Sequence, residues 1–307
     1  SMVQLCLRVD FSALQRVICC TVNQQNLWVI AQERRIMKIP TRKDLDKLSS
    51  GELKQIKKSL RGLPTQSQVD HSMFYGKLVR FGYYSDPHCG EKNFKEPLWR
   101  AMIEFFQKNN IRNVYCPGDN CEGMSGRPGH IYELAHIGAT AQLNYAASLF
   151  KLAPRLDFHI IDGNHDQWFK EKNNAGLVAG AELQNRCENV HFLGEWEARI
   201  MLAQNVELML FHGNDGTAYA DSYKLQKLIE SLEGGKKPNI ILSGHYHKQV
   251  AIFRRNVFGF ECGTLCGQTR FMRGKKIPAH MGFGVIEVWV GKRGIERLRH
   301  EFFPYYD

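Results

Sequence analysis

Several features that mark other classes of protein are missing from this sequence. No apolar run approaches the roughly 20 residues that a helix needs to cross a bilayer. The opening residues, SMVQLCLRVDF, have neither the basic start nor the long apolar stretch of a secretory signal peptide. There is no internal repeat and no low-complexity segment. We therefore expect no membrane partner, and the pattern excludes a repeat architecture.

Cysteine is present, but not in the pattern of a structural scaffold. The nine cysteines are an odd number and none forms a Cys-x-x-Cys pair, which argues against a zinc ribbon. Irregular spacing in a chain of 307 residues fits a reducing compartment better than a disulfide framework. We expect an intracellular, cytoplasmic protein.

Acidic residues are fewer than basic residues, and the excess of basic residues is distributed unevenly along the chain. The net charge is +10, from 41 Lys and Arg against 31 Asp and Glu. Residues 1–75 hold twelve of the former and six of the latter, so most of the excess lies in the first quarter of the chain. Basic segments are typical of proteins that bind nucleic acid, and DNA is the partner that we expect. Charge alone does not distinguish nucleic acid from another acidic surface.

The basic N-terminal segment, residues 1–61, has a helical pattern. Ser49-Ser50-Gly51-Glu52 resembles a capping box, and Leu53, Ile56 and Leu60 follow on one face of a helix. A shorter helical pattern, RKDLDKL, comes just before it. Two such helices could form a helix-turn-helix. The alternative is a small helical cap with a solvated basic face, and the sequence leaves both open.

Residues 62–76 are mostly polar and read as a linker, and a different pattern fills residues 77–307. Short apolar runs there end in glycine-rich polar clusters, with helical stretches between them. This alternation predicts an α/β fold built on a layered sheet. The predicted strands are 77–84, 113–116, 158–161, 207–211, 239–242 and 250–253, with a late antiparallel pair at 282–290 and 295–303, and the predicted helices are 96–108, 131–150 and 218–232.

Polar clusters follow five of these strands in succession. In open α/β sheets, ligands bind beyond the carboxyl ends of the strands, so these side chains should meet at one rim. The clusters are Asp86-Pro87-His88, Gly118-Asp119-Asn120, Gly163-Asn164-His165-Asp166, His212-Gly213-Asn214 and Gly244-His245-Tyr246-His247.

The donor types in these clusters suit a pair of divalent metal ions. Carboxylate, amide oxygen and imidazole together favour Mn, Fe, Zn or Ni over calcium, which prefers oxygen alone. In Asp-x-His and His-x-His, alternation along an extended segment places both side chains on one side. A single histidine is more often a hydrogen-bonded core residue, but five ordered clusters do not fit that explanation.

As an ordered set, the clusters resemble the calcineurin-like metallophosphoesterase superfamily, whose pattern is D-x-H, G-D, G-N-H-D or -E, H and G-H-x-H. The sequence reads DPH, GD, GNHD, H and GHYH, and the resemblance extends from Lys77 to the C-terminus. Pro87 and Asn120 depart from the usual residues without removing a ligand. The resemblance implies a layered β-sandwich core with flanking helices. It also implies a metal-dependent hydrolase of phosphoric esters with two divalent ions, Mn²⁺ being expected first.

The resemblance further implies a role for each residue. His165 would contact the phosphate and protonate the leaving oxygen or stabilise its charge, and Asp166 would orient His165 by accepting its other N–H. Seven residues would hold the metals: Asp86, His88 and His247 the first, Asn164, His212 and His245 the second, with Asp119 bridging both.

Substrate choice should come from two loops between the motifs. Cations interleaved with an aromatic residue suit a phosphate backbone and a stacked base. A solvated basic loop without a ligand is the alternative. The candidates are Arg127 and His130 in residues 122–130, and Arg270 and Arg273 beside Phe271 in residues 268–280.

Three functions are compatible with these residues. The first is a nuclease-like phosphodiesterase that acts on nucleic acid. The second is a phosphatase, or a phosphodiesterase for small or cyclic nucleotides, and the fold does not choose between these. The third is a nucleic-acid-binding protein with an inactive metal site, against which the complete ligand set and His165 argue.

Overall fold

The computed structural model describes residues 67–72, 77–171, 175–235 and 237–306. The chain separates into two compact units, Ser1–Ser67 and Gln68–Asp307, and the described residues belong almost entirely to the second. The predicted basic segment 1–61, with its helix-turn-helix alternative, lies outside the described residues.

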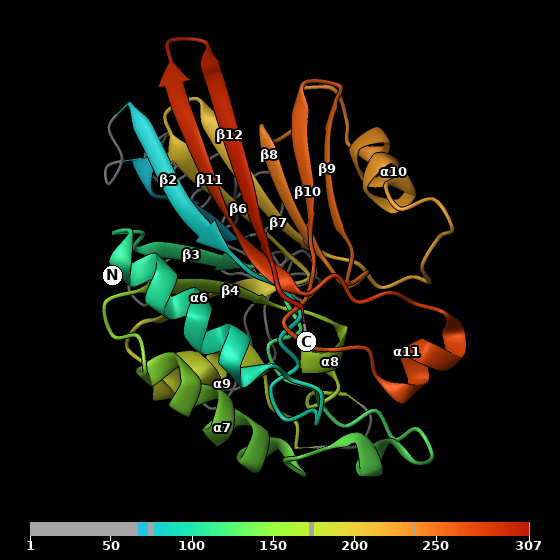
Figure 1. The fold of residues 1–307 in the computed structure, drawn as a ribbon. Coiled ribbons are helices and arrows are strands. Elements are labelled where there is room, and N and C mark those ends of the chain that lie inside the picture. The colour runs from blue at the N-terminus through green and yellow to red at the C-terminus, as the bar shows by residue number, and fades with distance from the viewer. Residues whose placement is uncertain (1–66, 73–76, 172–174, 236, 307) are drawn as a thin grey trace, which may run out of the picture. The chain divides into compact units, whose positions relative to one another are not determined.

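Two six-stranded sheets form the centre of the described part (Figure 1). The first sheet runs in the order β1 (Ser67–Asp70), β6 (Glu197–Ala203), β7 (Val206–His212), β8 (Ile240–Gly244), β10 (Val257–Cys262) and β9 (Gln249–Arg254). The second runs in the order β12 (Gly294–Pro304), β11 (Gly282–Gly291), β2 (Leu78–Tyr83), β3 (Asn113–Cys116), β4 (Asp157–Asp162) and β5 (Val190–Glu195).

Parallel pairing holds the middle of each sheet. Strands β2, β3, β4 and β5 pair in parallel in one sheet, and β7, β8 and β10 do so in the other. The run Phe-His-Ile-Ile in β4 is buried throughout, as expected of a parallel strand that is covered on both faces. Because parallel strands point the same way, the residues that follow them emerge at the same edge.

Helices cover the outer face of each sheet (Figure 1). Apolar side chains fill three layers: between the two sheets, between the second sheet and its helices, and between the first sheet and its helix. The helices on the second sheet are α6 (Glu96–Lys108), α7 (Ala139–Lys151) and α9 (Ala179–Arg186), the helix on the first is α10 (Tyr223–Ser231), and η2 (His130–Glu133), α8 (Asn164–Gln167) and α11 (Arg270–Lys275) lie in connections.

The sequence accounts for α6 in particular. Pro97 lies in its first turn, where the missing N–H would have no intrahelical partner in any case. Leu98, Met102 and Phe106 recur every four residues and form its buried face. Full burial of side chains of this size stabilises the fold by about 1.5–3 kcal/mol each. Packing on the sheet therefore holds this helix in place.

The structure corrects three predicted boundaries. Strand β1 lies inside the predicted linker 62–76 and joins the first sheet beside β6. The predicted helix 131–150 is two elements, η2 and α7, because Gly138 between them has a left-handed backbone with φ of 88°. The predicted helix 218–232 begins only at Tyr223. The predictions 96–108 and 113–116 are confirmed as α6 and β3, and the late strands form the antiparallel pair β11–β12.

None of the described helices combines the length and the apolar character that crossing a membrane requires. Six of the described cysteines are buried and unpaired. Burial raises the pKa of the Cys116 thiol, and likewise that of Cys262, so the reactive thiolate is disfavoured at both. These cysteines serve as apolar core residues.

Candidate metal centre

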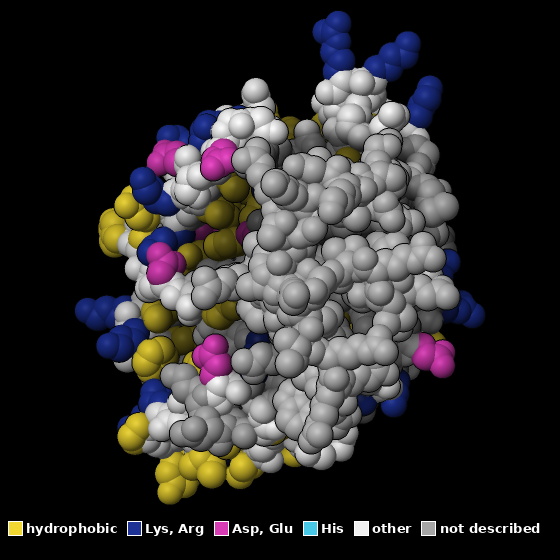
Figure 2. Space-filling view, turned by 180° about the vertical axis from the view of Figure 1, so that it is seen from behind, with side chains coloured by type: hydrophobic (Ala, Val, Ile, Leu, Met, Phe, Trp, Pro, Cys, Tyr) yellow, Lys and Arg dark blue, Asp and Glu magenta, His cyan; other side chains and the backbone are white. Residues whose placement is uncertain are grey.

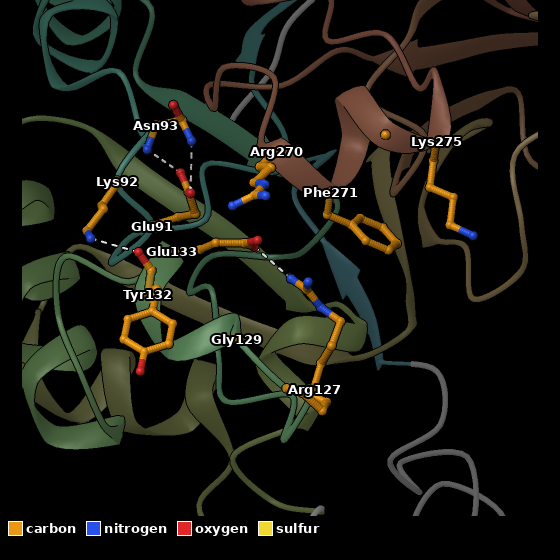
Figure 3. A pocket seen from close by; sticks show the side chains of 12 residues that line it. Glu91, Lys92, Asn93, Arg127, Gly129, Tyr132, Glu133, Arg270, Phe271 and Lys275 are labelled. Atoms are coloured by element: carbon orange, nitrogen blue, oxygen red, sulfur yellow. Dashed lines mark hydrogen bonds and ion pairs between the residues drawn. The ribbon is translucent and has the colours of Figure 1, made fainter.

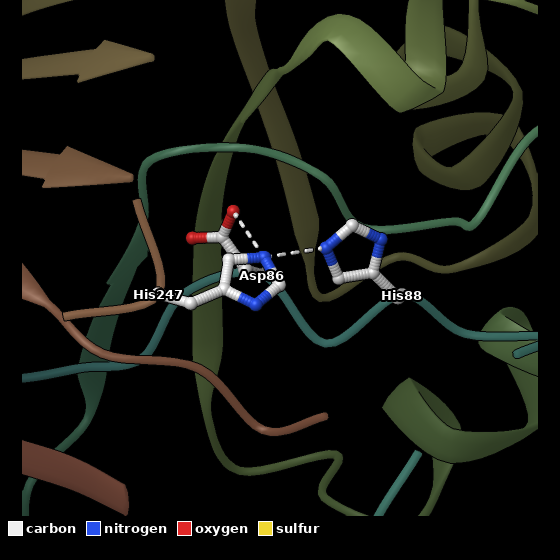
Figure 4. A group of neighbouring side chains, drawn as sticks. All are labelled: Asp86, His88 and His247. Carbon is white, nitrogen blue, oxygen red and sulfur yellow. Dashed lines mark hydrogen bonds and ion pairs between the residues drawn. The ribbon is translucent and has the colours of Figure 1, made fainter. Parts of the chain in front are cut away.

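The first group of predicted ligands comes together as the sequence predicts. His88 Nε2 lies 3.0 Å from His247 Nε2, and Asp86 Oδ1 lies 3.5 Å from the same His247 atom (Figure 4). Asp86 is fully buried, and its carboxylate accepts hydrogen bonds from the Ser85 hydroxyl and from the backbone N–H of His245. The three ligand atoms lie within 4.8 Å of one another, which is close enough to surround a single ion.

The second group is equally compact. Asn164 Oδ1 lies 3.0 Å from His212 Nε2 and 2.8 Å from His245 Nδ1. Ligand atoms of His212, His245 and Asp119 also lie within 4.8 Å of one another. Residues from β7, from the loop after β8 and from the start of α8 therefore meet at one point.

Asp119 lies between the two groups. Its Oδ2 atom is 3.2 Å from His212 Nε2 in the second group and 3.8 Å from His88 Nε2 in the first. Its Oδ1 atom accepts a hydrogen bond from the backbone N–H of His165 at 2.9 Å. This is the position that the predicted bridging role requires.

The backbone is strained where the ligands leave their strands. Ten of the described non-glycine residues have a positive φ, and half of them are predicted ligands. Such a conformation costs about 1–3 kcal/mol at each residue, and it persists only where the surroundings enforce it. Hydrogen bonds from the backbone N–H of Asp86 to Gly118 and of His88 to Asp119 do so here. The five residues are Asp86 (47°), His88 (50°), Asp119 (54°), His245 (86°) and His247 (55°).

Hydrogen bonds behind the ligands select the imidazole nitrogen that faces the centre. His212 Nδ1 donates to the carbonyl of Pro117 at 2.7 Å, which leaves Nε2 facing inward. His245 Nε2 donates to the carbonyl of Asp215 at 2.9 Å, which leaves Nδ1 as the ligand atom. Such contacts fix the tautomer and the ring orientation of a metal-binding histidine.

His165 lies beside this centre with one nitrogen restrained. Its Nδ1 donates to the carbonyl of Glu122 at 2.9 Å and lies 3.3 Å from the Glu122 carboxylate. The ring of Trp168 packs against it at a centroid distance of 3.9 Å. Burial opposes protonation, but Glu122 and Asp119 outweigh it and raise the pKa of His165 to about 10. The side chain is 22% exposed, so a protonated imidazole can still reach a substrate.

Asp166 does not orient His165, contrary to the prediction. Its buried carboxylate accepts hydrogen bonds from the backbone N–H groups of Asn120, Cys121 and Gly163, at 3.0, 2.8 and 3.0 Å. His165 and Asp166 are consecutive residues of α8, and neighbours in a helix do not face each other. Asp166 therefore ties the loop after β3 to the loop after β4.

Glu122 takes the orienting position, and sequence reasoning assigned it no role. Its carboxylate lies 2.7 Å from His88 Nδ1 and 2.7 Å from His130 Nε2, besides its contact with His165. It thus joins a predicted ligand, the predicted acid and a loop histidine. The only signal in the sequence is its place three residues after Asp119, within the same turn.

The residues present fit two divalent ions. Each group combines imidazole nitrogen with a carboxylate or amide oxygen, the donor set of Mn, Fe, Zn and Ni sites. The pair of His88 and His247 supports the first site, because two imidazole nitrogens at 3.0 Å repel unless a proton or a cation lies between them. We expect Asp86, His88 and His247 to hold one ion, and Asn164, His212 and His245 the other.

The predicted substrate residues separate into different surroundings. His130 is only 3% exposed and is bonded to Glu122, so it is not available to a substrate, which corrects that prediction. Arg127 and Arg270 line a pocket of about 760 Å³ between the loop after β3 and α11 (Figure 3). Arg273 is exposed on α11 but is not among the residues that line this pocket.

The chain was compared with curated sequences and with solved structures. No curated protein sequence matches the chain. Among solved structures, an archaeal phosphodiesterase is 15% identical, with a TM-score of 0.43, over 73% of this chain and 100% of its own. Yfce, a phosphoesterase from E. coli, is 16% identical, with a TM-score of 0.40, over 72% of this chain and 98% of its own. Vps29 from Entamoeba histolytica, solved with zinc, is 12% identical, with a TM-score of 0.39, over 74% of this chain and 99% of its own.

A family match covers most of the second unit, Gln68–Asp307. The calcineurin-like phosphoesterase superfamily domain matches residues 79–278, which is more than half of the chain and includes every predicted ligand. The residues at the strand ends and the family match therefore agree, and this chain belongs to the calcineurin-like phosphoesterase superfamily.

Proposed function

We propose that this protein is a dinuclear metal-dependent phosphodiesterase that hydrolyses phosphodiester bonds in nucleic acid. One observation carries the proposal: seven predicted ligands from five strand ends come together, with Asp119 between the two groups and His165 beside them. A phosphoesterase needs both parts, a cationic centre that receives the phosphate and a proton donor next to it.

The chain's own groups divide the chemistry between them. When bound, two divalent ions polarise the phosphoryl oxygens and lower the pKa of the attacking water. As the new P–O bond forms, the bond to the leaving oxygen breaks, and that oxygen takes a proton from His165 Nε2. His165 Nδ1 is held by Glu122, so the ring presents Nε2 in one orientation. The imidazole ends the step neutral and regains its proton from solvent.

Nucleic acid is the substrate class that the surrounding charges favour. Arg127, Arg270 and Lys275 line the pocket beside the metal centre. In addition, most of the excess positive charge of the chain belongs to residues 1–75. A polyanion gains from several such contacts at once, whereas a phosphate monoester gains from one or two.

The test is Mn²⁺-dependent cleavage of end-labelled single- and double-stranded DNA by the full-length protein. We expect cleavage that EDTA abolishes and that Mn²⁺ restores, and a loss of about 10²- to 10⁴-fold in the His165→Asn variant. A ladder of fragments would indicate endonuclease action, and stepwise loss of terminal nucleotides would indicate exonuclease action. Intact DNA together with hydrolysis of small phosphoesters would replace this substrate by a nucleotide or a monoester. Intact substrates of every kind, in protein that binds DNA, would leave a binding protein with an inactive centre.

A further inference from the structure

We propose that the pocket between residues 127–133 and α11 binds one nucleotide unit of the substrate, its base on Phe271 and its phosphate on Arg270. This inference rests on the proposed function, since it places a second part of a nucleic-acid strand next to the metal centre. The pocket has a volume of about 760 Å³, enough for a nucleotide together with water.

The aromatic wall of the pocket is held in position before any ligand binds. Phe271 is 43% exposed, and the guanidinium carbon of Arg127 lies 4.8 Å from the centre of its ring. Arg127 in turn forms an ion pair with Glu133 at 2.6 Å, and Figure 3 shows Phe271 and Arg127 pointing toward one another across the pocket. An arginine held over one face of an aromatic ring strengthens a stacking surface for a base.

A cation is available for the phosphate. Arg270 precedes Phe271 on α11 and projects into the pocket (Figure 3). Among the described residues it has no carboxylate partner, whereas Arg127 is committed to Glu133. Lys92 lies on the opposite wall, where its ammonium group donates to the carbonyl of Tyr132 at 2.7 Å. Arg270 is therefore the group best placed to form a bidentate contact with a phosphate.

More apolar surface continues from the pocket along the same loop. Ile131, Tyr132 and Ile137 are 47%, 79% and 56% exposed. Figure 2 shows a group of exposed hydrophobic side chains at the lower edge of the view, where the segment between β3 and α7 lies in Figure 1. Cations beside exposed aromatic groups are the surface on which single strands bind, because every base has a face that can stack.

The pocket and the metal centre share one loop. Arg127 and Gly129 line the pocket, while the next residue, His130, turns inward to Glu122. Glu122 contacts both His88 and His165, and the ring of His130 packs edge-on against Trp168 at a centroid distance of 5.8 Å. A nucleotide in the pocket would therefore lie against the same loop that supports His165 through Glu122.

The experiment compares two short ligands that differ only in their bases. Fluorescein-labelled hexathymidylate and a matched abasic hexamer are titrated, by fluorescence anisotropy, with full-length Mn²⁺-loaded protein that carries His165→Asn and so leaves both intact. We expect Phe271→Ala to weaken hexathymidylate binding about tenfold or more and to change abasic binding less than twofold. Arg270→Gln should weaken both ligands and reduce the slope of log affinity against log salt by about 0.7.

Matched controls lie outside the pocket. Phe253→Ala removes a phenylalanine that is 61% exposed on β9, and Arg293→Gln removes an exposed arginine of the β11–β12 turn, and neither should alter the preference for bases. A Phe271→Ala variant that keeps the wild-type ratio of the two affinities, or loses both ligands equally, would overturn the inference. If the wild-type protein cleaves DNA but the variants lack this binding pattern, the role of the pocket is rejected and the proposed function stands. If the binding pattern is found without cleavage, the role of the pocket stands and the proposed function is rejected.

Discussion

The Nε2 atoms of His88 and His247 lie 3.0 Å apart, although 159 positions separate the two residues in the chain. One imidazole can donate a proton to the other at this distance, or both can bind the same cation. A positive φ at both residues turns the two rings toward this point. The metal content of a variant that lacks one of these two rings is therefore the most direct test of the first metal site.

Replacing His247 by Ala should remove one metal and keep the other. The ligands of the second group, His212, His245 and Asn164, do not depend on the His247 side chain. We expect the metal content of Mn²⁺-loaded protein to fall from about two ions per chain to about one. Elemental analysis after gel filtration measures this directly. An unchanged content of two would show that His247 is not a ligand.

Replacing His165 by Asn should leave the metal content unchanged and lower the turnover. Its ring packs against His88 and Trp168 and its Nδ1 is bonded to Glu122, but it is not a predicted metal ligand, and only its backbone N–H is bonded to Asp119. Loss of a general acid lowers the rate by about 10²- to 10⁴-fold. The two measurements are metal content and turnover at saturating Mn²⁺. Wild-type turnover in this variant would exclude His165 as the proton donor.

Replacing Glu122 by Gln should lower activity about 10- to 100-fold, in the range found for groups that support metal ligands. An amide offers one acceptor and one donor group to side chains that now share a carboxylate, so His88 and His165 lose a common partner. Glu122→Asp should recover part of the loss, and its pH profile should approach that of the wild type. His130→Asn serves as the comparison, because His130 contacts Glu122 without being a predicted metal ligand or the predicted acid. Equal activity in Glu122→Gln and the wild type would contradict the orienting role.

The stability of the fold should depend on His300 at mildly acidic pH. His300 Nε2 lies 2.6 Å from the hydroxyl of the buried Tyr83. Burial lowers the pKa of His300 to about 4, although Glu301 acts in the opposite direction. The unfolded chain has a histidine pKa of about 6.5, so it binds more protons than the native state between pH 6.5 and 4. The contribution of His300 is complete above pH 6.5 and is lost as the pH falls toward 4.

A non-titrating side chain should remove this dependence. We expect the free energy of unfolding of the wild type to fall by about 2 kcal/mol more than that of His300→Gln between pH 7 and pH 4. Denaturant unfolding followed by circular dichroism at a series of pH values gives both curves. Parallel curves would mean that His300 is protonated equally in the folded and unfolded chains.

The sequence predicted correctly which side chains meet at one edge of the sheets, because their positions follow from topology. Apolar runs ending in Asp119, Asn164 or His212 place polar groups at the carboxyl edge of parallel strands, and that rule needs no knowledge of side-chain conformation. The orienting role of Asp166 came from the family resemblance, and the contacts of its carboxylate contradict it. In α8 the side chain that follows His165 points elsewhere.

Conformation and long-range contact account for what the sequence did not predict. Glu122 reaches three histidines only because the backbone on both sides of it turns, and no periodicity marks such a turn. The helix predicted over 131–150 failed at Gly138, where the apolar pattern continued but the backbone became left-handed. The pocket joins Arg127 to Phe271 across 144 positions of the chain, a contact that no local pattern indicates.

Three glycines, which have no side chain to bind a metal, are needed for the geometry of the predicted metal centre. A β-carbon on Gly118 or Gly244 would collide with the ring of His212, and one on Gly163 would collide with both Asp119 and His212. The set of positions that tolerate no replacement is therefore larger than the set that touches metal. In a library of all single substitutions, variants at these glycines should be as rare among the active proteins as variants at the histidines. Replacement of these glycines by alanine should abolish activity as completely as replacement by tryptophan.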